Sequence, residues 1–433
     1  MRTGWHLSFL RGAGVPENRN AFSFIINKGG HIMTLVTNGR LITRDPDGQG
    51  YYERGAVAYE GTKIVEVGEE AALKAKYPKA EIIDARGGVI MPAFINAHTH
   101  IYSALARGLS IVGNNPTSFY EVLDGTWWAI DRRLMMDGTR ASATALYMDS
   151  IKQGVTTIFD HHASYGEIPG SLHTIAEESK RLGLRSCLCY EVSDRDGEEK
   201  CLQAIRENAD FITECERRKD PMLAAMFGGH ALFTISDKTF DRMVEANNGR
   251  TGYHIHVSEG MNDVYDSLQN YGRRPVQRLQ DHGILGPKTI LGHCIHVNTA
   301  EMEIIAETGT MVVNNPESNM GNAIGICPVL QLYKRGILLG MGTDAYTNDM
   351  LESLKVALCS QRSQNCLPNV GWCEVTDMLF KNNAKIGERY FPDQLGVLKA
   401  GAAADIIVMD YKPFTPFSDE NIDGHMIFGM TGR

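Results

Sequence analysis

Hydrophobic and polar residues follow two different patterns along the chain. Over residues 34–89, short alternating runs are separated by turn residues, which predicts a small β-rich unit. From about residue 88 onward, short apolar runs alternate with segments of amphipathic helix length. Strands buried on both faces and separated by helices are typical of a parallel sheet.

The second pattern repeats often enough to predict a closed barrel. Its apolar runs lie near residues 89–94, 155–159, 184–189, 222–227, 252–257, 289–291, 311–313 and 337–341. Helical candidates between and after them cover residues 138–153, 175–182, 198–219, 237–247, 275–281, 300–308 and 350–362. Eight strand and helix units predict a (β/α)₈ barrel.

A strand pattern returns near the end of the chain, at residues 401–410. We therefore expect an α/β protein in which a (β/α)₈ TIM-type barrel, residues 90–395, is inserted into a small β-sandwich domain. Residues 34–89 and 396–433 would form that small domain. Residues 1–32 show no clear period, and we treat them as an N-terminal extension of uncertain status that precedes a natural start at Met33.

Composition narrows the possible partners. The chain has 433 residues, a formal net charge of −9 and no long basic run, so we expect neither nucleic acid nor a membrane as a partner. Its nine cysteines are scattered and odd in number, which favours free thiols in the cytoplasm over a disulfide framework. A homodimer is a reasonable expectation.

The most informative motif is His98-Thr99-His100, which ends the apolar run at residues 89–94 and its continuation. Side chains alternate along a strand, so His98 and His100 point to the same side and can reach one ion. Taken alone, such a pair is more often a surface feature than a metal site.

Further polar residues follow other predicted strands, where the active sites of barrels of this type lie. They are His230 after the fourth run, His256 and Glu259 after the fifth, His293 after the sixth and Asp344 after the eighth. Three histidines and one aspartate can form a Zn²⁺ or Fe²⁺ shell with room for water. Each residue also has an ordinary interpretation, such as a helix N-cap for Asp344, but their joint position at strand ends favours a metal site.

These motifs resemble the amidohydrolase superfamily, from residue 34 to the end of the chain. The resemblance rests on His-x-His after the first strand, histidines after the fifth and sixth, and aspartate after the eighth. The segments at residues 92–100, 315–319 and 395–405 also fit, with Ala93 where the family usually has glycine. Within the superfamily, the chain is similar to the group of aminohydrolases that act on cytosine, guanine or adenosine and to the chlorohydrolases.

The resemblance implies roles for the strand-end residues. His98, His100, His256 and Asp344 would bind one divalent metal ion, with Zn²⁺ favoured and Fe²⁺ as the alternative. Asp344 would also accept a proton from the hydrolytic water. His293 would orient that water, and Glu259 would protonate a ring nitrogen of the substrate. The fourth strand ends without the lysine that binds a second metal in hydantoinase-like relatives.

Five further residues are candidates for substrate contacts. The resemblance implies this role for His230, and either ring of His161-His162 could face the substrate or belong to a loop. Asn319 lies in the matching segment 315–319. Trp128 could cover a flat ring, although packing in the core is the favoured alternative. We interpret His254 as structural because it lies one layer below His256.

Together, these inferences predict a metal-dependent hydrolase of a C–N bond, other than a peptide bond, in a small nitrogen heterocycle. Deamination of a purine-, pteridine- or triazine-like ring is favoured. Hydrolytic ring opening of an oxidised purine or cyclic amide is the main alternative. Dechlorination, or a scaffold without catalysis, is a weaker one.

Overall fold

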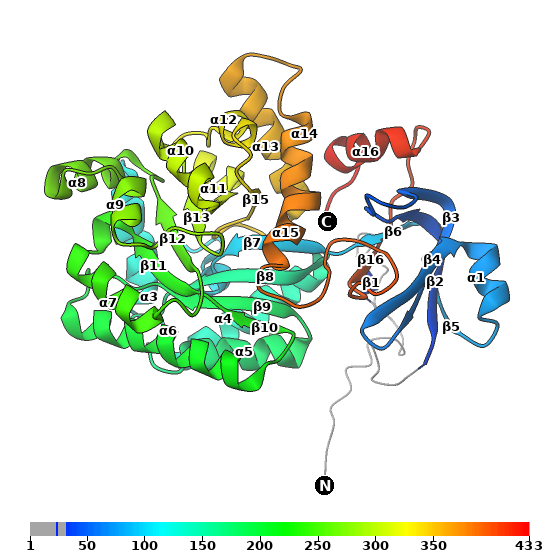
Figure 1. Cartoon of the computed structure of the whole chain (residues 1–433), viewed down its shortest axis with the longest axis horizontal. Helices are drawn as coiled ribbons and strands as arrows, with labels where there is room; N and C mark the ends of the chain where they lie inside the picture. The colour runs from blue at the N-terminus through cyan, green and yellow to red at the C-terminus, as the bar shows by residue number, and fades with distance from the viewer. Residues whose placement is uncertain (1–22, 25–31, 433) are drawn as a thin grey trace, which may run out of the picture.

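The computed structural model describes residues 23–24 and 32–432, so the predicted extension over residues 1–32 lies almost wholly outside the described residues. A large barrel of strands and helices lies beside a smaller sheet that contains both early and late segments of the chain (Figure 1). The barrel carries the residues that sequence analysis selected, and the small sheet lies to one side of it.

The small sheet is built from both ends of the chain, as predicted. Its seven strands form one mixed sheet in the order β1-β16-β6-β2-β3-β4, with β5 paired to β2. The strands are β1 (Ser23–Phe24), β2 (Thr34–Ile42), β3 (Tyr51–Glu60), β4 (Lys63–Glu69), β5 (Glu81–Asp84), β6 (Val89–Pro92) and β16 (Ile406–Met409). Buried Val36, Val57, Ile90 and Ile406 pack together in its core.

The barrel contains the eight predicted strand positions. They are β7 (Phe94–Thr99), β8 (Val155–His162), β9 (Arg185–Tyr190), β10 (Leu223–Ala225) with β11 (Phe227–Ala231), β12 (Tyr253–Val257), β13 (Ile290–His293), β14 (Met311–Asn314) and β15 (Leu339–Met341). Neighbouring strands pair in parallel, and β10 and β11 share the fourth position. Parallel bridges from Thr99 to Asp344 and from Val192 to Gly229 close the ring.

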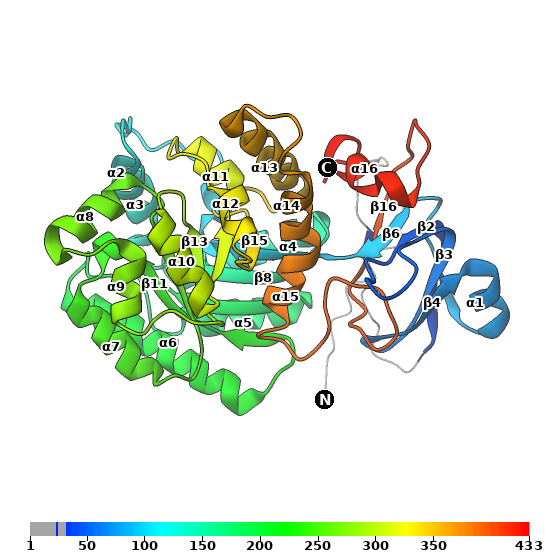
Figure 2. The ribbon, with the colours of Figure 1, turned by 45° about the horizontal axis from the view of Figure 1, so that its top comes forward.

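Helices surround the barrel, and a few lie next to the small sheet. They are α1 (Glu70–Lys76), α2 (Phe119–Val122), α3 (Trp128–Asp131), α4 (Met136–Lys152), α5 (Ser171–Leu182), α6 (Glu198–Arg218), α7 (Asp237–Asn247), α8 (Met261–Tyr271), α9 (Pro275–Asp281), α10 (Thr299–Thr308), α11 (Pro316–Gly321), α12 (Val329–Lys334), α13 (Met350–Asn365), α14 (Trp372–Asp377), α15 (Asn383–Gly387) and α16 (Ile422–Phe428). The helices α7 and α9 have the predicted bounds. Eight of the described helices were not predicted: α2, α3, α8, α11, α12, α14, α15 and α16. Of these, α16 packs against α13 (Figure 2).

One predicted strand is divided between the two parts of the molecule. The apolar run at residues 89–94 was interpreted as the first barrel strand, but β6 pairs with β16 and β2 in the small sheet. At Phe94 the chain changes partners, and its backbone N–H donates to the carbonyl of Gly154 next to β8. The small sheet and the barrel both bury residues 89–94, so hydrophobicity alone does not show where the chain passes from one to the other.

Helix ends around the barrel follow ordinary capping rules. At the start of α10, Asn298 accepts a hydrogen bond from the backbone of Glu301, and the Glu301 side chain accepts one from the backbone of Asn298. The helix stops at Gly309, whose φ of 66° suits a residue without Cβ. Such caps define where the loop after β13 rejoins the helical layer.

Apolar side chains fill the barrel below the strand ends. Phe159 lies on β8, two residues before His161. Cys187 and Cys189 lie on β9, four and two residues before Glu191, which directly follows that strand. Because side chains alternate along a strand, these residues share a face with the polar residue that follows. They belong to one buried cluster that also contains Phe391. The polar residues therefore form a separate layer above an apolar interior.

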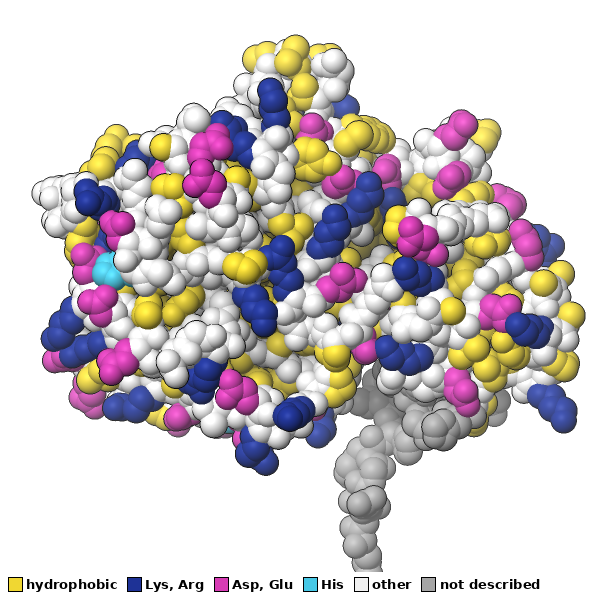
Figure 3. Space-filling model, in the orientation of Figure 1, with side chains coloured by type: hydrophobic (Ala, Val, Ile, Leu, Met, Phe, Trp, Pro, Cys, Tyr) yellow, Lys and Arg dark blue, Asp and Glu magenta, His cyan; other side chains and the backbone are white. Residues whose placement is uncertain are grey.

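The surface carries interspersed charges of both signs on the face shown in Figure 3. Among the described residues, no helix has the length and apolar character needed to cross a membrane.

Candidate active site

The four predicted metal ligands lie together at the carboxyl ends of their strands. His98 lies on β7, His100 directly follows it, His256 lies on β12, and Asp344 follows β15. Nε2 of His100 lies 3.0 Å from Oδ1 of Asp344 and 3.3 Å from Nε2 of His256. The rings of His98 and His256 have centroids 5.1 Å apart. All four side chains are buried.

The other ring nitrogen of each histidine has a protein partner. Nδ1 of His100 donates to the carbonyl oxygen of His161 at 2.6 Å, and Nδ1 of His256 donates to that of His230 at 2.8 Å. With their protons on Nδ1, these rings present the lone pair of Nε2 to the centre of the group. Fixing the tautomer in this way is typical of metal-binding histidines.

His98 follows the same rule with a histidine as its partner. Its Nδ1 lies 2.8 Å from Nε2 of His254. Its own Nε2 is buried and has no hydrogen-bond partner in the described part of the chain. A buried nitrogen left unpartnered among three other potential ligands fits a metal ion better than it fits a packed core.

The electrostatics also favour a cation at this point. Burial lowers the pKa of His98 and His256 well below the usual value, so both imidazoles are neutral, as metal binding requires. Burial also opposes charge on His100, but the carboxylates of Asp344 and Glu191 raise its pKa to about 9. In the absence of a metal ion, His100 is therefore protonated, and its positive charge lies between the carboxylates of Asp344 and Glu191.

Asp344 is held against the first barrel strand. The carbonyl oxygen of His98 accepts hydrogen bonds from the backbone N–H groups of Thr343 and Asp344, each at 3.0 Å. Oδ2 of Asp344 accepts a hydrogen bond from Ser318 Oγ. The φ of Asp344 is 56°, in the left-handed region that non-glycine residues rarely adopt. Such strained residues cluster at functional sites.

His293 and Glu259 lie next to the metal candidates. Nε2 of His293 is 3.5 Å from Oε1 of Glu259 and 3.5 Å from Oδ2 of Asp344. Nδ1 of His293 donates to Oδ1 of Asn319 at 2.7 Å, and the φ of His293 is 71°. Burial, followed by repulsion from Asp344, raises the pKa of Glu259 well above its usual value. Glu259 therefore carries a proton that it can donate.

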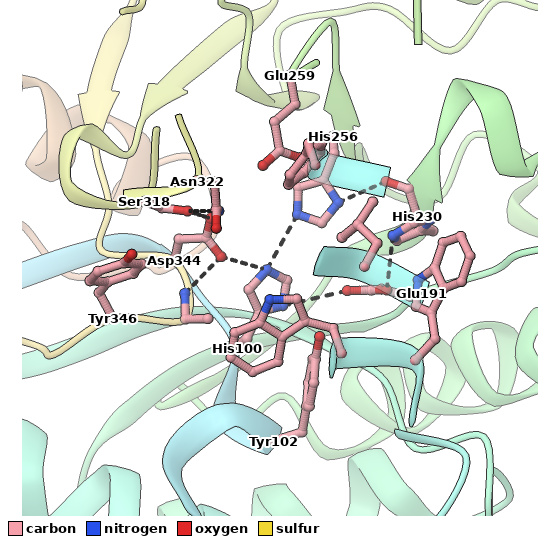
Figure 4. A pocket seen from close by; sticks show the side chains of 15 residues that line it. His100, Tyr102, Glu191, His230, His256, Glu259, Ser318, Asn322, Asp344 and Tyr346 are labelled. Carbon is pink, nitrogen blue, oxygen red and sulfur yellow. Dashed lines mark hydrogen bonds and ion pairs between the residues drawn. The ribbon is translucent and has the colours of Figure 1, made fainter. Parts of the chain in front are cut away.

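An open cavity of about 480 Å³, including space continuous with solvent, lies over these groups. It is lined by His100, Tyr102, Phe119, Leu123, Trp127, Trp128, Glu191, His230, His256, Glu259, Ser318, Asn322, Asp344, Ala345 and Tyr346. Glu259 and Asp344 lie on one side of His100, and Glu191 and His230 on the other (Figure 4). Aromatic walls with a few convergent polar groups are typical of a site for a small molecule.

The predicted substrate contacts divide into two sets. Trp128 and His230 line the cavity, whereas His161, His162 and Asn319 are not among its lining residues in the described part of the chain. Nδ1 of His161 contacts Glu191, and its Nε2 donates to the carbonyl oxygen of His254. Burial lowers the pKa of His162 to about 3. We therefore carry only Trp128 and His230 forward as substrate contacts.

Sequence reasoning missed Glu191 and the role of His254. Glu191 is only 3% exposed, and Oε1 lies 3.0 Å from Nδ1 of His161 and 3.4 Å from Nδ1 of His100. Burial alone would raise its pKa, but these imidazoles lower it to about 2. Glu191 directly follows the third barrel strand, so its position offered the same signal as the other strand-end residues.

A buried ion pair supports Trp128. Nη2 of Arg195 lies next to Oδ2 of Asp131, and both side chains are at most 5% exposed. The guanidinium of Arg195 lies 5.0 Å from the ring centre of Trp128 and 4.1 Å from that of Tyr165. Cation–π contacts of this kind fix the orientation of an aromatic ring.

Comparison with known proteins gives a consistent result. The model described as "Amidohydrolase family" matches residues 89–431, and an imidazolonepropionase-like composite domain of bacteria matches residues 55–80. A 5'-deoxyadenosine deaminase from Methanosarcina barkeri is 29% identical over 406 residues, which are 92% of this chain and 89% of the relative. A 5-methylthioadenosine/S-adenosylhomocysteine deaminase from Thermococcus sibiricus is 31% identical over 407 residues, 92% of this chain and 90% of the relative.

Solved structures share the fold. A zinc-bound adenosine deaminase from Xanthomonas campestris has a TM-score of 0.80 and 22% identity, covering 92% of this chain and 89% of the other. An atrazine chlorohydrolase from Arthrobacter aurescens in complex with zinc has a TM-score of 0.76 and 23% identity, covering 92% of each chain.

Proposed function

The chain belongs to the amidohydrolase family, and from this premise we propose that it is a metal-dependent aminohydrolase that releases ammonia from a small nitrogen heterocycle. Purine-, pteridine- and triazine-like rings are the favoured substrates. Two overlapping groups of potential ligands share His98, one with His100 and Asp344 and the other with His256 and His293. They lie beside a protonated glutamate in an aromatic cavity, and this arrangement carries the proposal.

We propose that His98, His100, His256 and Asp344 hold one divalent metal ion, with Zn²⁺ favoured. Their fit rests on the unpartnered Nε2 of His98 and the converging Nε2 atoms of His100 and His256. The two zinc-bound structural neighbours support this choice. When bound, such an ion acts as a Lewis acid that lets water ionise near neutral pH.

The protein groups divide the proton transfers between them. Asp344 takes up the proton that the attacking water loses, at the carboxylate oxygen facing His293. His293, whose Nδ1 proton is held by Asn319, directs Nε2 at the same space and orients the water. Glu259 donates its proton to a ring nitrogen next to the carbon under attack, so that the electrons of the C=N bond move to that nitrogen.

Departure of ammonia completes the cycle. The exocyclic nitrogen leaves as ammonia once it receives the proton stored on Asp344, and Glu259 recovers its proton from the ring nitrogen. Each carboxyl group thus returns to its starting state. Trp128 and His230 line the cavity in which the ring would lie. Positioning of this kind is a large part of enzymatic rate enhancement.

The test is a panel of purines, pteridines and triazines supplied to the metal-loaded protein. Ammonia release and the ultraviolet spectrum are followed together, with metal content measured on the same sample. The expected result is one equivalent of ammonia for each ring converted. Spectral loss without ammonia would indicate ring opening, and chloride release would indicate dechlorination. A metal-loaded protein that is inert on the whole panel, or turnover that persists after the metal is removed, would refute the proposal.

The remaining expectations concern location and assembly. We propose a cytoplasmic location on the basis of the odd number of scattered cysteines, and all nine are free in the structure. A homodimer also remains a proposal.

A further inference from the structure

Glu191 and His230 form one wall of the cavity, on the side of His100 away from Glu259 and Asp344 (Figure 4). The two side chains are nearly inaccessible, with 3% exposure for Glu191 and 7% for His230. Oε2 of Glu191 lies 3.9 Å from Nε2 of His230, beyond hydrogen-bonding distance. The hydrogen-bonding character of these two atoms decides what can bind between them.

His230 presents an acceptor to the cavity. Its Nδ1 lies 2.8 Å from Oγ1 of Thr234, and that hydroxyl donates its own hydrogen to the carbonyl oxygen of Ala231 at 3.0 Å. Oγ1 of Thr234 therefore accepts a hydrogen bond, and Nδ1 of His230 must carry the proton. Since a neutral imidazole has one N–H, Nε2 carries only a lone pair.

Glu191 presents a second acceptor. Its Oε1 is occupied by Nδ1 of His161. Its Oε2 has no hydrogen-bond partner in the part of the chain that the structure describes, where Tyr102 also lines the cavity without bonding to either acceptor. Two acceptors cannot satisfy each other. Both atoms face the open cavity, so a ligand that displaces solvent from this wall must supply donors or leave both acceptors unpaired.

We infer that the substrate supplies the missing donors, as a ring N–H, an exocyclic NH₂ group or both, on the edge that faces Glu191 and His230. This inference rests on the proposed function and narrows its substrate class. The preferred rings are free bases in lactam or amino form whose nitrogens on that edge are unsubstituted. Rings that are alkylated there offer only acceptors and leave both wall atoms unpaired.

The charges of the cavity restrict the substrate further. Glu191, Glu259 and Asp344 line it, and its lining residues in the described part of the chain include no lysine or arginine. On the wall away from the proposed metal ligands, an anionic substituent would meet the Glu191 carboxylate with no lysine or arginine to pair with it. The substrate class is therefore an uncharged or cationic heterocycle without a carboxylate or phosphate group.

Matched ligands test this inference. Guanine and pterin are compared with methylated derivatives in which the N–H hydrogens are replaced one at a time. Turnover is measured with the metal-loaded protein, and dissociation constants are measured by calorimetry with the slow Glu259→Gln variant. One of the methylations is expected to weaken binding and kcat/KM by 10²-fold or more, because sites built around hydrogen bonds reject analogues that lack them strongly.

Two variants locate the effect. Glu191→Gln adds an amide N–H beside Nε2 of His230, so the preference for the unmethylated ring is expected to fall below about 10-fold. Thr234→Val removes the acceptor that fixes the tautomer of His230 and is expected to reduce the preference as well. Glu199→Gln and Thr213→Val, exposed on α6, are the matched controls and should keep the wild-type preference.

The outcomes separate the inference from the proposed function. Equal binding of parent and methylated rings to the wild-type protein would overturn the inference, even if ammonia is released. An unchanged preference in both Glu191→Gln and Thr234→Val would also overturn it. Selective binding of unmethylated rings without ammonia release would support the inference that the ligand donates hydrogen bonds to Glu191 and His230, and would contradict the proposed function. Failure of every base to bind would overturn both.

Discussion

Nδ1 of His98 lies 2.8 Å from Nε2 of His254, so one buried imidazole orients another. If His98 holds a metal ion through Nε2, its proton is on Nδ1 and His254 is the acceptor. We predict that His254→Phe lowers metal affinity 10- to 100-fold, the usual cost of losing such a partner. Competition with a chromogenic chelator measures the change.

A conservative variant distinguishes orientation from packing. Gln in place of His254 can still accept the proton of His98, so His254→Gln is expected to recover part of the lost affinity. His282→Gln is the control, since His282 pairs with Asp241 at the surface. Equal metal affinity in wild-type protein and His254→Phe would contradict the assigned role.

Gly342 allows Asp344 to approach the first barrel strand. A Cβ atom there would lie 2.6 Å from the carbonyl oxygen of His98 and 2.5 Å from Oδ1 of Asn315. We predict that Gly342→Ala displaces His98, reduces metal content and lowers the free energy of unfolding by about 1–3 kcal/mol. Urea unfolding and metal analysis measure both effects.

Gly286 provides the matched control for this substitution. A Cβ atom at Gly286 would meet nothing within 4 Å. Gly286→Ala should therefore change the free energy of unfolding by no more than about 0.5 kcal/mol. If the two alanine variants have the same metal content and the same free energy of unfolding, the lack of a Cβ at Gly342 is not required for metal binding or stability.

Hydrophobic periodicity predicted the barrel because each of its strands is a short apolar run between helices. It also placed His98, His100, His256 and Asp344 at one edge, because parallel strands bring their carboxyl ends together. The same signal fails at residues 89–94, where two different sheets bury consecutive residues of one apolar run.

Other features of the site have no local signal. The left-handed backbone at His293 and Asp344 is imposed by tertiary contacts and not by glycine. Alternation correctly placed His254 below His256, but it does not reveal that the ring reaches His98 across the barrel. Likewise, adjacent His161 and His162 differ in their partners because of what lies on each face of β8.

The buried pair of Asp131 and Arg195 predicts a large effect on stability. Asp131→Asn removes the nearer carboxylate partner of the buried Arg195 guanidinium and leaves only Asp196, whose Oδ2 lies 3.7 Å from Nε. The variant is expected to lower the free energy of unfolding by about 3–5 kcal/mol. The double variant Asp131→Leu with Arg195→Met removes both charges and should recover much of that loss. Urea unfolding of the metal-loaded protein measures each value.

An exposed pair serves as the comparison. Arg273 and Asp281 are 60% and 56% exposed, so Asp281→Asn should cost less than about 1 kcal/mol. A similar cost for Asp131→Asn would show that water or rearrangement compensates Arg195. Because Arg195 also packs on Trp128, Asp131→Asn is expected to raise KM.

Glu259 separates proton donation from metal binding. Its carboxyl group contacts His293, and Glu259 is not one of the four proposed metal ligands. We predict that Glu259→Gln keeps the fold and the metal content and lowers kcat by about 10²- to 10⁴-fold, the usual range for a general acid. Asp344→Ala, by contrast, should lose metal and activity together.

Steady-state ammonia release and metal analysis on the same samples distinguish the two variants. Full turnover by Glu259→Gln would assign the ring-nitrogen proton to another group, and loss of metal from it would place Glu259 among the ligands.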